Sequence, residues 1–199
     1  KSMKEKTFQL RTMTMTAMLA AVSIVLMYLE FSVPFVPSFL KFDFSDLPAL
    51  IGSFAFGPLC GVLICLVKNV VHLFATMTGG IGELSNFLLS MIFVLPAGII
   101  YKKKKTRRRA FLGALIGTFS MAAVSVFTNY FVVYPIYYNF MPKETVLGLY
   151  QAIFPFVKNM WQALIVCNVP FTIVKGLCNT LICFLIYHKI SPLLKGKRS

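Results

Sequence analysis

The chain of 199 residues is 58% hydrophobic and only 13% charged, and its mean hydropathy is +0.78. A soluble domain carries about 25% charged residues, so this composition excludes an ordinary soluble fold and indicates one integral membrane domain. A net charge of +14 would suggest nucleic-acid binding in a soluble protein, but most Lys and Arg residues lie at the ends of apolar segments, which argues against it.

Six apolar segments are predicted to cross the membrane as helices, since about 20 helical residues span roughly 30 Å of hydrocarbon. The first two are 14–33 and the short 46–56, separated by a long loop that contains Asp43. Asp46 is expected to cap the second helix. The other four segments are 59–77, 84–101, 110–133 and 161–190. Between the last two lies a second long loop, 134–158, with a short helix near 144–154.

The basic block KKKKTRRR at 102–109 sets the orientation, because Lys and Arg beside a span stay on the cytoplasmic side. With six spans, the N-terminus, this block and the C-terminus all lie in the cytoplasm, and the two long loops lie outside. A re-entrant hairpin at 47–67 is the alternative, and it would place the basic segments on opposite sides. The sequence therefore predicts an all-α, multi-pass protein of the cell membrane with six transmembrane helices.

Polar side chains form a stripe on the last span, at helical spacing: Asn168, Thr172, Lys175 and Asn179. An ionisable residue inside a membrane helix normally faces the bundle interior, either paired or lining a cavity. We expect the stripe to contribute to a ligand site. The alternatives are that Lys175 pairs structurally with an acid such as Glu83, or that it extends to the membrane interface.

Two further groups of polar residues lie on other spans. Asn129 follows Thr118 and Ser125 on one helix face, whereas bonds to their own helix backbone are the alternative for the hydroxyls of Ser125 and Thr128. Glu83, Asn86 and Ser90 form another stripe, although Glu83 and Asn86 could simply cap a helix. Lys68 and His72, four residues apart, are interpreted as an internal structural pair.

Motifs for catalysis are absent from the sequence. It contains no G-x-x-x-x-G-K-[ST], HExxH or GxSxG motif, and its five cysteines form no CxxC pair, so no enzyme activity, metal site or bound cofactor is expected. A small membrane enzyme acting on lipids is the remaining alternative of another class. Aromatic residues near the predicted outer end, combined with converging amides, would suit a flat heteroaromatic ligand.

Three segments resemble the substrate-binding (S) components of energy-coupling factor (ECF) vitamin transporters, and among them the riboflavin-specific type. They are FDFSDLPALIG at 42–52, FGPLCG at 56–61 and NVPFTIVKG at 168–176. The resemblance implies a six-helix subunit that binds riboflavin near the outer face, with the first loop as a gate. Another vitamin, such as thiamine, biotin or folate, is the alternative ligand.

The resemblance also implies partners and roles for residues. A transmembrane coupling subunit and two cytoplasmic ATPases would use ATP to drive import, and the small residues Ala17 and Ala21 would lie where the coupling subunit docks. The edge of the flavin ring would form hydrogen bonds with Asn168, Asn129 and Lys175. The ribityl hydroxyls would meet Asp43, Glu83 and the backbone of residues 78–80, which includes Gly80. Asn86, Thr172 and Asn179 complete the predicted substrate-binding set.

Overall fold

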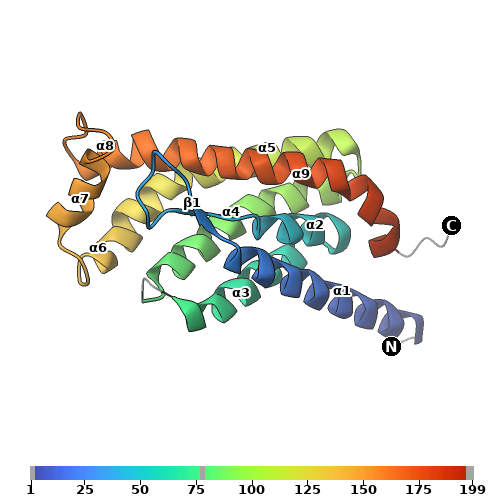
Figure 1. Ribbon diagram of the computed structural model, residues 1–199. Coiled ribbons are helices and arrows are strands. Elements are labelled where there is room, and N and C mark those ends of the chain that lie inside the picture. Colours follow the sequence, from blue (N-terminus) through green and yellow to red (C-terminus); the bar gives the residue numbers. More distant parts are fainter. Residues whose placement is uncertain (1–2, 77–78, 196–199) are drawn as a thin grey trace.

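The computed structural model describes residues 3–76 and 79–195, and nearly all of its regular structure is helical (Figure 1). The helices, in chain order, are α1 (Met3–Tyr28), α2 (Asp46–Phe56), α3 (Pro58–His72), α4 (Ile81–Lys103), α5 (Arg107–Thr128), α6 (Tyr134–Tyr137), α7 (Lys143–Gln151), α8 (Met160–Ala163) and α9 (Val169–Lys195). Three shorter helical segments interrupt or extend them: the 3-10 turn η1 (Leu73–Ala75) and the π-helices η2 (Asn129–Val133) and η3 (Leu164–Asn168).

Five helical stretches within the described residues are long and apolar enough to cross a membrane. They are Gln9–Tyr28, Pro58–Ala75, Ile81–Lys103, Arg107–Tyr137 and Met160–Ile186. The helix α2 has the bounds predicted for the second span, but with 11 residues it belongs to the shorter apolar helices. The chain is therefore an all-α membrane protein, and a sixth crossing at α2 stays a prediction.

The first predicted span, 14–33, ends too late. The helix α1 stops at Tyr28, because residues just after it turn into a small antiparallel ribbon in which β1 (Phe31–Ser32) pairs with β2 (Lys41–Phe42). The ribbon folds residues 29–45, hereafter loop 1, back over the bundle. The predicted short helix near 144–154 is present as α7, shifted toward the N-terminus.

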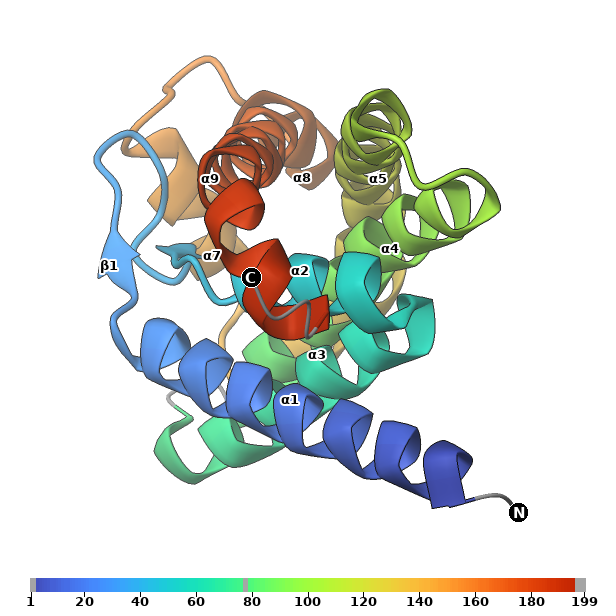
Figure 2. The ribbon, with the colours of Figure 1, turned by 90° about the vertical axis from the view of Figure 1, so that its right-hand side faces the viewer.

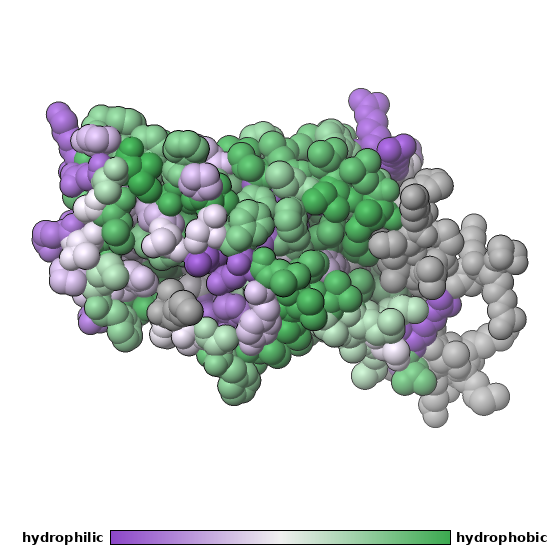
Figure 3. All heavy atoms as spheres, in the orientation of Figure 1, coloured by the Kyte–Doolittle hydropathy of each residue, from purple (hydrophilic) through white to green (hydrophobic). Residues whose placement is uncertain are grey.

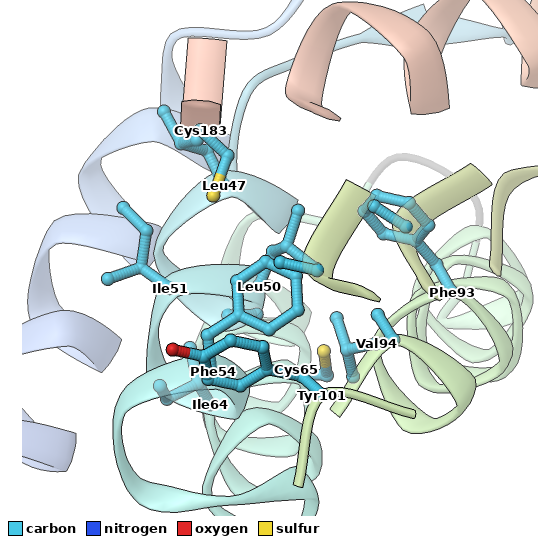
Figure 4. Packing of buried hydrophobic residues seen from close by; sticks show 14 of the residues in the cluster. Leu47, Leu50, Ile51, Phe54, Ile64, Cys65, Phe93, Val94, Tyr101 and Cys183 are labelled. Carbon is cyan, nitrogen blue, oxygen red and sulfur yellow. The ribbon is translucent and has the colours of Figure 1, made fainter. Parts of the chain in front are cut away.

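The main core lies around α2, whose side chains from Asp46 to Phe54 are all buried. Leu50 of α2, Ile64 of α3 and Phe93 of α4 have no exposed surface, and they pack in one cluster with residues of α5 and α9 (Figure 4). Burial on every side explains why so short a helix is stable here, since packing rather than propensity holds most helices in proteins.

Glycines let α5 approach α4 closely. At Gly113 an added Cβ would lie 2.9 Å from the carbonyl oxygen of Ala97, and at Gly117 it would overlap the carbonyl oxygen of Phe93. The spacing Gly113-x-x-x-Gly117 places both on one helix face, which is a common way for membrane helices to bring their backbones together.

The two ends of the bundle differ. The start of α1, the end of α9 and the turn between α4 and α5 lie at one end, and α6, α7 and α8 lie at the other (Figures 1 and 2). Hydrophilic residues gather at both ends and apolar residues cover most of the surface between them, with one smaller hydrophilic patch on that face (Figure 3). This is the pattern expected of a protein whose middle lies in lipid.

Candidate functional site

Two π-helices hold the two asparagines that the sequence marks as candidates. Asn129 begins η2, and Asn168 ends η3. Both side chains are buried, with 6% and 2% of their surface exposed. The segment η2 packs against α4, and η3 packs against α5. Single-turn π-helices inside α-helices are uncommon and are frequent at functional sites, because the altered turn changes the direction of a side chain.

Four charged side chains meet beneath loop 1, hereafter the buried charge cluster: Asp43, Asp46, Lys68 and Lys175. The Lys175 Nζ lies 2.7 Å from Oδ2 of Asp43 and 3.8 Å from Oδ2 of Asp46. The Lys68 Nζ lies 2.5 Å from Oδ1 of Asp46. Two positive and two negative charges balance, which is how buried ions are tolerated in an apolar interior.

Serines complete the hydrogen bonds of the buried charge cluster. Lys68 donates to Ser45 Oγ at 2.6 Å, and Ser90 donates to Asp46 Oδ1 at 2.5 Å. Ser23 of α1 donates to the carbonyl oxygen of Ser45. Loop 1 is thereby fastened to α1, α3 and α9, and Ser90 joins α4 to the start of α2. Ser90 lies 3.0 Å from Asn86 Oδ1, so Asn86 reaches the cluster through Ser90.

The charge of Asp43 depends on its neighbours. Burial alone raises the pKa of this loop carboxyl, but the ammonium groups of Lys175 and Lys68 outweigh it and lower the pKa to about 2. The backbone N–H of Ser45 also donates to Asp43 Oδ1 at 2.8 Å. Asp43 is therefore held as a carboxylate under all physiological conditions.

The alternative in which Lys175 pairs with an acid is present in the structure, with Asp43 as the partner in place of Glu83. Two predicted details are wrong. Lys68 and His72 do not form a pair, because each has turned to a different acid: Lys68 to Asp46 and His72 to Glu83. Asp46 does not cap α2, since Ser45 precedes the helix and the Asp46 carboxylate is used by the charge cluster. Spacing along one helix could not reveal partners supplied by other helices.

Glu83 and Gly80 lie at the connection between α3 and α4. The Glu83 carboxylate lies 2.9 Å from His72 Nδ1, and it accepts a hydrogen bond of 2.9 Å from Thr76. The Gly80 N–H donates to Thr76 Oγ1 at 3.0 Å, with Gly80 at φ +88°, a conformation that favours glycine. These bonds fasten the turn. The backbone of Thr78, predicted as a ligand contact, lies outside the described residues.

Asn168 and Asn129 each have a side-chain partner. Tyr150 of α7 donates to Asn168 Oδ1 at 2.8 Å, and the hydroxyls of Tyr150 and Tyr134 lie 2.5 Å apart. Ser85 of α4 donates to Asn129 Oδ1 at 3.1 Å. Each amide is thus held by its oxygen.

Two more residues of the predicted substrate-binding set, Thr172 and Asn179, lie on α9. Thr172 and Asn179 are buried, and the Asn179 amide donates to the carbonyl oxygen of Lys175 in its own helix at 2.9 Å. Its Oδ1 lacks a hydrogen-bond partner among the described residues. Ser125 and Thr128 bond to their own helix backbone, which was the alternative left open for them, and Thr118 does the same.

An apolar cavity of about 480 Å³ separates loop 1 from α9. Its walls are almost wholly hydrocarbon. The polar stripe predicted on the last span is not part of its lining: Asn168, Thr172, Lys175 and Asn179. The lining residues are Phe31, Val33, Phe35, Val36, Phe42, Phe44, Phe154, Val166, Cys167, Pro170, Phe171, Val174 and Cys178. On α1, Ala17 and Ala21 are exposed while Ala20 is buried, so the predicted docking residues lie on the face of α1 that points away from the helix bundle.

Buried amides, a balanced charge cluster and a covering loop within an apolar helical bundle define a multi-pass membrane protein of the cell membrane with an internal polar site. Residues 11–187 match the family described as "ECF transporter, substrate-specific component", and the chain belongs to this family. It is a family of transporter subunits, not of enzymes.

Named relatives agree with the family. The chain is 32% identical to the riboflavin transporter RibU of Staphylococcus aureus (strain TCH60), over 90% of this chain and 89% of that protein. It is 29% identical to the riboflavin transporter FmnP of Bacillus subtilis (strain 168), over 96% and 97% of the two chains. A solved structure described as "Structure and mechanism of the S component of a bacterial ECF transporter" superposes with a TM-score of 0.75, at 32% identity and covering 96% of this chain and 99% of that one.

The sequence did not reveal Tyr150, which bonds to the candidate residue Asn168. Tyr150 lies in a segment whose sequence is typical of a membrane interface, where aromatic residues are common for other reasons. The sequence drew attention to Asp46 and Ser90, but the bonds of Lys68 and Ser90 to Asp46 depend on how three helices pack.

Proposed function

We propose that this chain is the riboflavin-binding subunit of an ATP-driven ECF importer and that it captures riboflavin at the outer face. The observation that carries the proposal is the placement of buried Asn129, Asn168 and Lys175 on helices that pack together beneath loop 1. Relatives named riboflavin transporters, similar over nearly the whole chain, support the choice of ligand.

The chemistry of these side chains suits riboflavin. The edge of the flavin ring offers carbonyl acceptors and one N–H donor, and an amide side chain can match both kinds of group. The Lys175 ammonium has three N–H donors, of which the bond to Asp43 uses one, so others are available for an acceptor oxygen or ring nitrogen. Phe39 of loop 1 and Tyr150 of α7, whose rings meet edge-on where Tyr150 bonds to Asn168, provide an aromatic wall for the rings.

In this proposal the end of the bundle with α6, α7 and α8 faces outward, and the basic turn between α4 and α5 faces the cytoplasm. That turn carries seven Lys and Arg side chains in the stretch 102–109, all of them exposed. Two ATPases supply the energy through a transmembrane coupling subunit, and the coupling subunit meets the chain at the exposed Ala17 and Ala21. Ala17→Leu with Ala21→Leu is expected to leave riboflavin binding intact and to reduce uptake by the assembled transporter at least about tenfold.

Equilibrium dialysis of the purified protein against riboflavin tests the proposal. Saturable binding of about one riboflavin per chain is expected, and a yellow colour in the purified protein would support it. If wild-type protein binds no riboflavin but binds thiamine, biotin or folate, the ligand is wrong while the class stands. If none of these binds, the proposal fails.

The role of Lys175 in binding can be separated from its role in the fold. Lys175→Met is expected to weaken riboflavin binding at least about tenfold, which corresponds to about 1.4 kcal/mol. The double variant Asp43→Asn with Lys175→Met removes one charge of each sign, so it keeps the cluster balanced. Asp43→Asn alone is measured beside it, because Asp43 is itself a predicted ligand contact. If Lys175 contacts the ligand, the double variant regains stability but binds riboflavin more weakly than Asp43→Asn alone. If Lys175 is only structural, the double variant binds at least as tightly as Asp43→Asn alone.

A further inference from the structure

Two tyrosines and Asn168 form a short chain of hydrogen bonds at the end of the bundle that carries α6–α8. The Tyr134 and Tyr150 hydroxyls lie 2.5 Å apart, and Tyr150 donates to Asn168 Oδ1 at 2.8 Å. All three side chains are buried, with 4%, 0% and 2% of their surface exposed. Because they come from α6, α7 and η3, the bonds connect the second long loop to the proposed site.

The direction of these bonds follows from counting protons. A phenol carries one proton, and that of Tyr150 is donated to Asn168, so the Tyr150 oxygen accepts the proton of Tyr134. Reversing the Asn168 amide would require Tyr150 to donate to Tyr134 instead. In the orientation present, each phenol proton has an acceptor, the Tyr150 oxygen for that of Tyr134 and Asn168 Oδ1 for that of Tyr150, and buried polar groups that are bonded in this way are favourable.

We propose that Tyr150 is a positioning residue: it holds the Asn168 amide by its oxygen, so that the Asn168 NH2 group is presented to the ligand as a donor. This inference rests on the proposed function. The fixed orientation makes the site selective for a ligand carbonyl at that point on the ring edge. An Asn168 amide that could rotate freely would bind an N–H donor of the ligand equally well.

Loop 1 covers this arrangement. The Phe39 ring meets Tyr150 edge-on, with ring centroids 5.7 Å apart at 77°, and it lies 6.0 Å from Tyr137. Phe39 therefore shields the phenols from water, and hydrogen bonds in such a dry environment are stronger and polarise one another. The loop that closes over the site thus also protects the side chain that orients Asn168.

Tyr150→Phe tests the inference, because it removes only the hydroxyl that bonds to Asn168. Riboflavin binding is expected to weaken about tenfold, the loss expected for one well-placed hydrogen bond. Tyr134→Phe keeps Tyr150 but removes the proton that the Tyr150 oxygen accepts, so the Tyr150 hydroxyl is no longer fixed toward Asn168. This variant is expected to weaken riboflavin binding by about twofold to threefold. Tyr138→Phe is the matched control, since Tyr138 stacks on Tyr134 through its ring, and its affinity should match wild type.

The same substitution in an Asn168→Ala background separates positioning from direct contact. If Tyr150 acts through Asn168, Tyr150→Phe changes the affinity of the Asn168→Ala protein less than about twofold. An equal loss in both backgrounds, or wild-type affinity for Tyr150→Phe, overturns the inference. If Tyr150→Phe does not fold, the Tyr134→Phe result decides instead, with unchanged affinity counting against it. A wild-type protein that fails to bind riboflavin would mark failure of the proposed function itself.

Discussion

Removing one member of the buried charge cluster should be far more harmful than removing a matched pair. In Lys175→Met, Asp43 and Asp46 keep their charges with only Lys68 to balance them. The Lys175 and Asp43 side chains expose only 11% and 3% of their surface, so water cannot compensate for the lost ammonium. Breaking a buried ion pair in this way costs about 3–5 kcal/mol.

The double variant Asp43→Asn with Lys175→Met should be much less destabilised. It retains the pair of Lys68 and Asp46, which are 2.5 Å apart, and leaves no excess charge. We expect a loss of roughly 1–2 kcal/mol, because replacing both partners of a buried pair is often close to neutral. With about 2 kcal/mol expected for Asp43→Asn alone, the two single effects should fail to add, and the coupling energy should be at least about 3 kcal/mol.

Unfolding in mixed micelles with increasing denaturing detergent gives the free energies for wild type, both single variants and the double variant. Lys41→Met is the control, because Lys41 lies in the same loop but donates to the exposed Ser32 hydroxyl at 3.0 Å. Its effect should stay below about 1 kcal/mol. The reasoning is refuted if Lys175→Met costs no more than Lys41→Met, or if the double variant is destabilised by the sum of the single effects.

Three further predictions concern stability and coupling. The pKa of Asp43 is lowered in the folded protein to about 2 from 3.8, so the carboxylate stabilises the fold fully above about pH 4 and this stabilisation is lost as pH falls toward 2. The free energy of unfolding, measured across this pH range, should fall by about 2 kcal/mol in wild type. Asp43→Asn should lack this fall. Gly117→Ala should destabilise the protein by about 1–3 kcal/mol, because the added Cβ overlaps the Phe93 carbonyl oxygen. Gly148→Ala in α7 is the control: nothing lies near its added Cβ, so it should be neutral or slightly stabilising. Equal effects of the two substitutions would contradict the packing argument. In cells that contain the partner subunits, Ala17→Leu with Ala21→Leu should reduce riboflavin uptake at least about tenfold with unchanged binding, and normal uptake would move the docking surface elsewhere.

Sequence patterns were sufficient for features that depend on one segment at a time. Apolar length located the long helices, and helical spacing grouped Asn168 at the end of η3 with Lys175 of α9, both of them buried. The identity of a partner on another helix was beyond such patterns. Asp43 lies 132 positions from Lys175 along the chain, and Tyr150 reaches Asn168 only because α7 folds back over the bundle. The π-helices were also not foreseen, since no residue type requires them.

The end of α1 shows the same limit. The apolar run continues to Val33, so hydropathy alone extends the helix, but pairing of Phe31 with Phe42 in the ribbon ends it at Tyr28. Tertiary contacts within loop 1 overrode the local preference. The loop then carries Asp43 to Lys175, a contact on which both the stability of the site and the proposed gate depend.

Labelling with a membrane-impermeant thiol reagent in intact cells tests the central claim, that a riboflavin site opens outward beneath loop 1. Ser38→Cys places a thiol at an exposed position of loop 1, and Lys105→Cys places one in the exposed basic turn, with wild type as the control for the native cysteines. We predict that Ser38→Cys is labelled and that riboflavin slows its labelling, while Lys105→Cys reacts only after permeabilisation. Labelling of Lys105→Cys in intact cells, with Ser38→Cys protected regardless of riboflavin, would contradict the account.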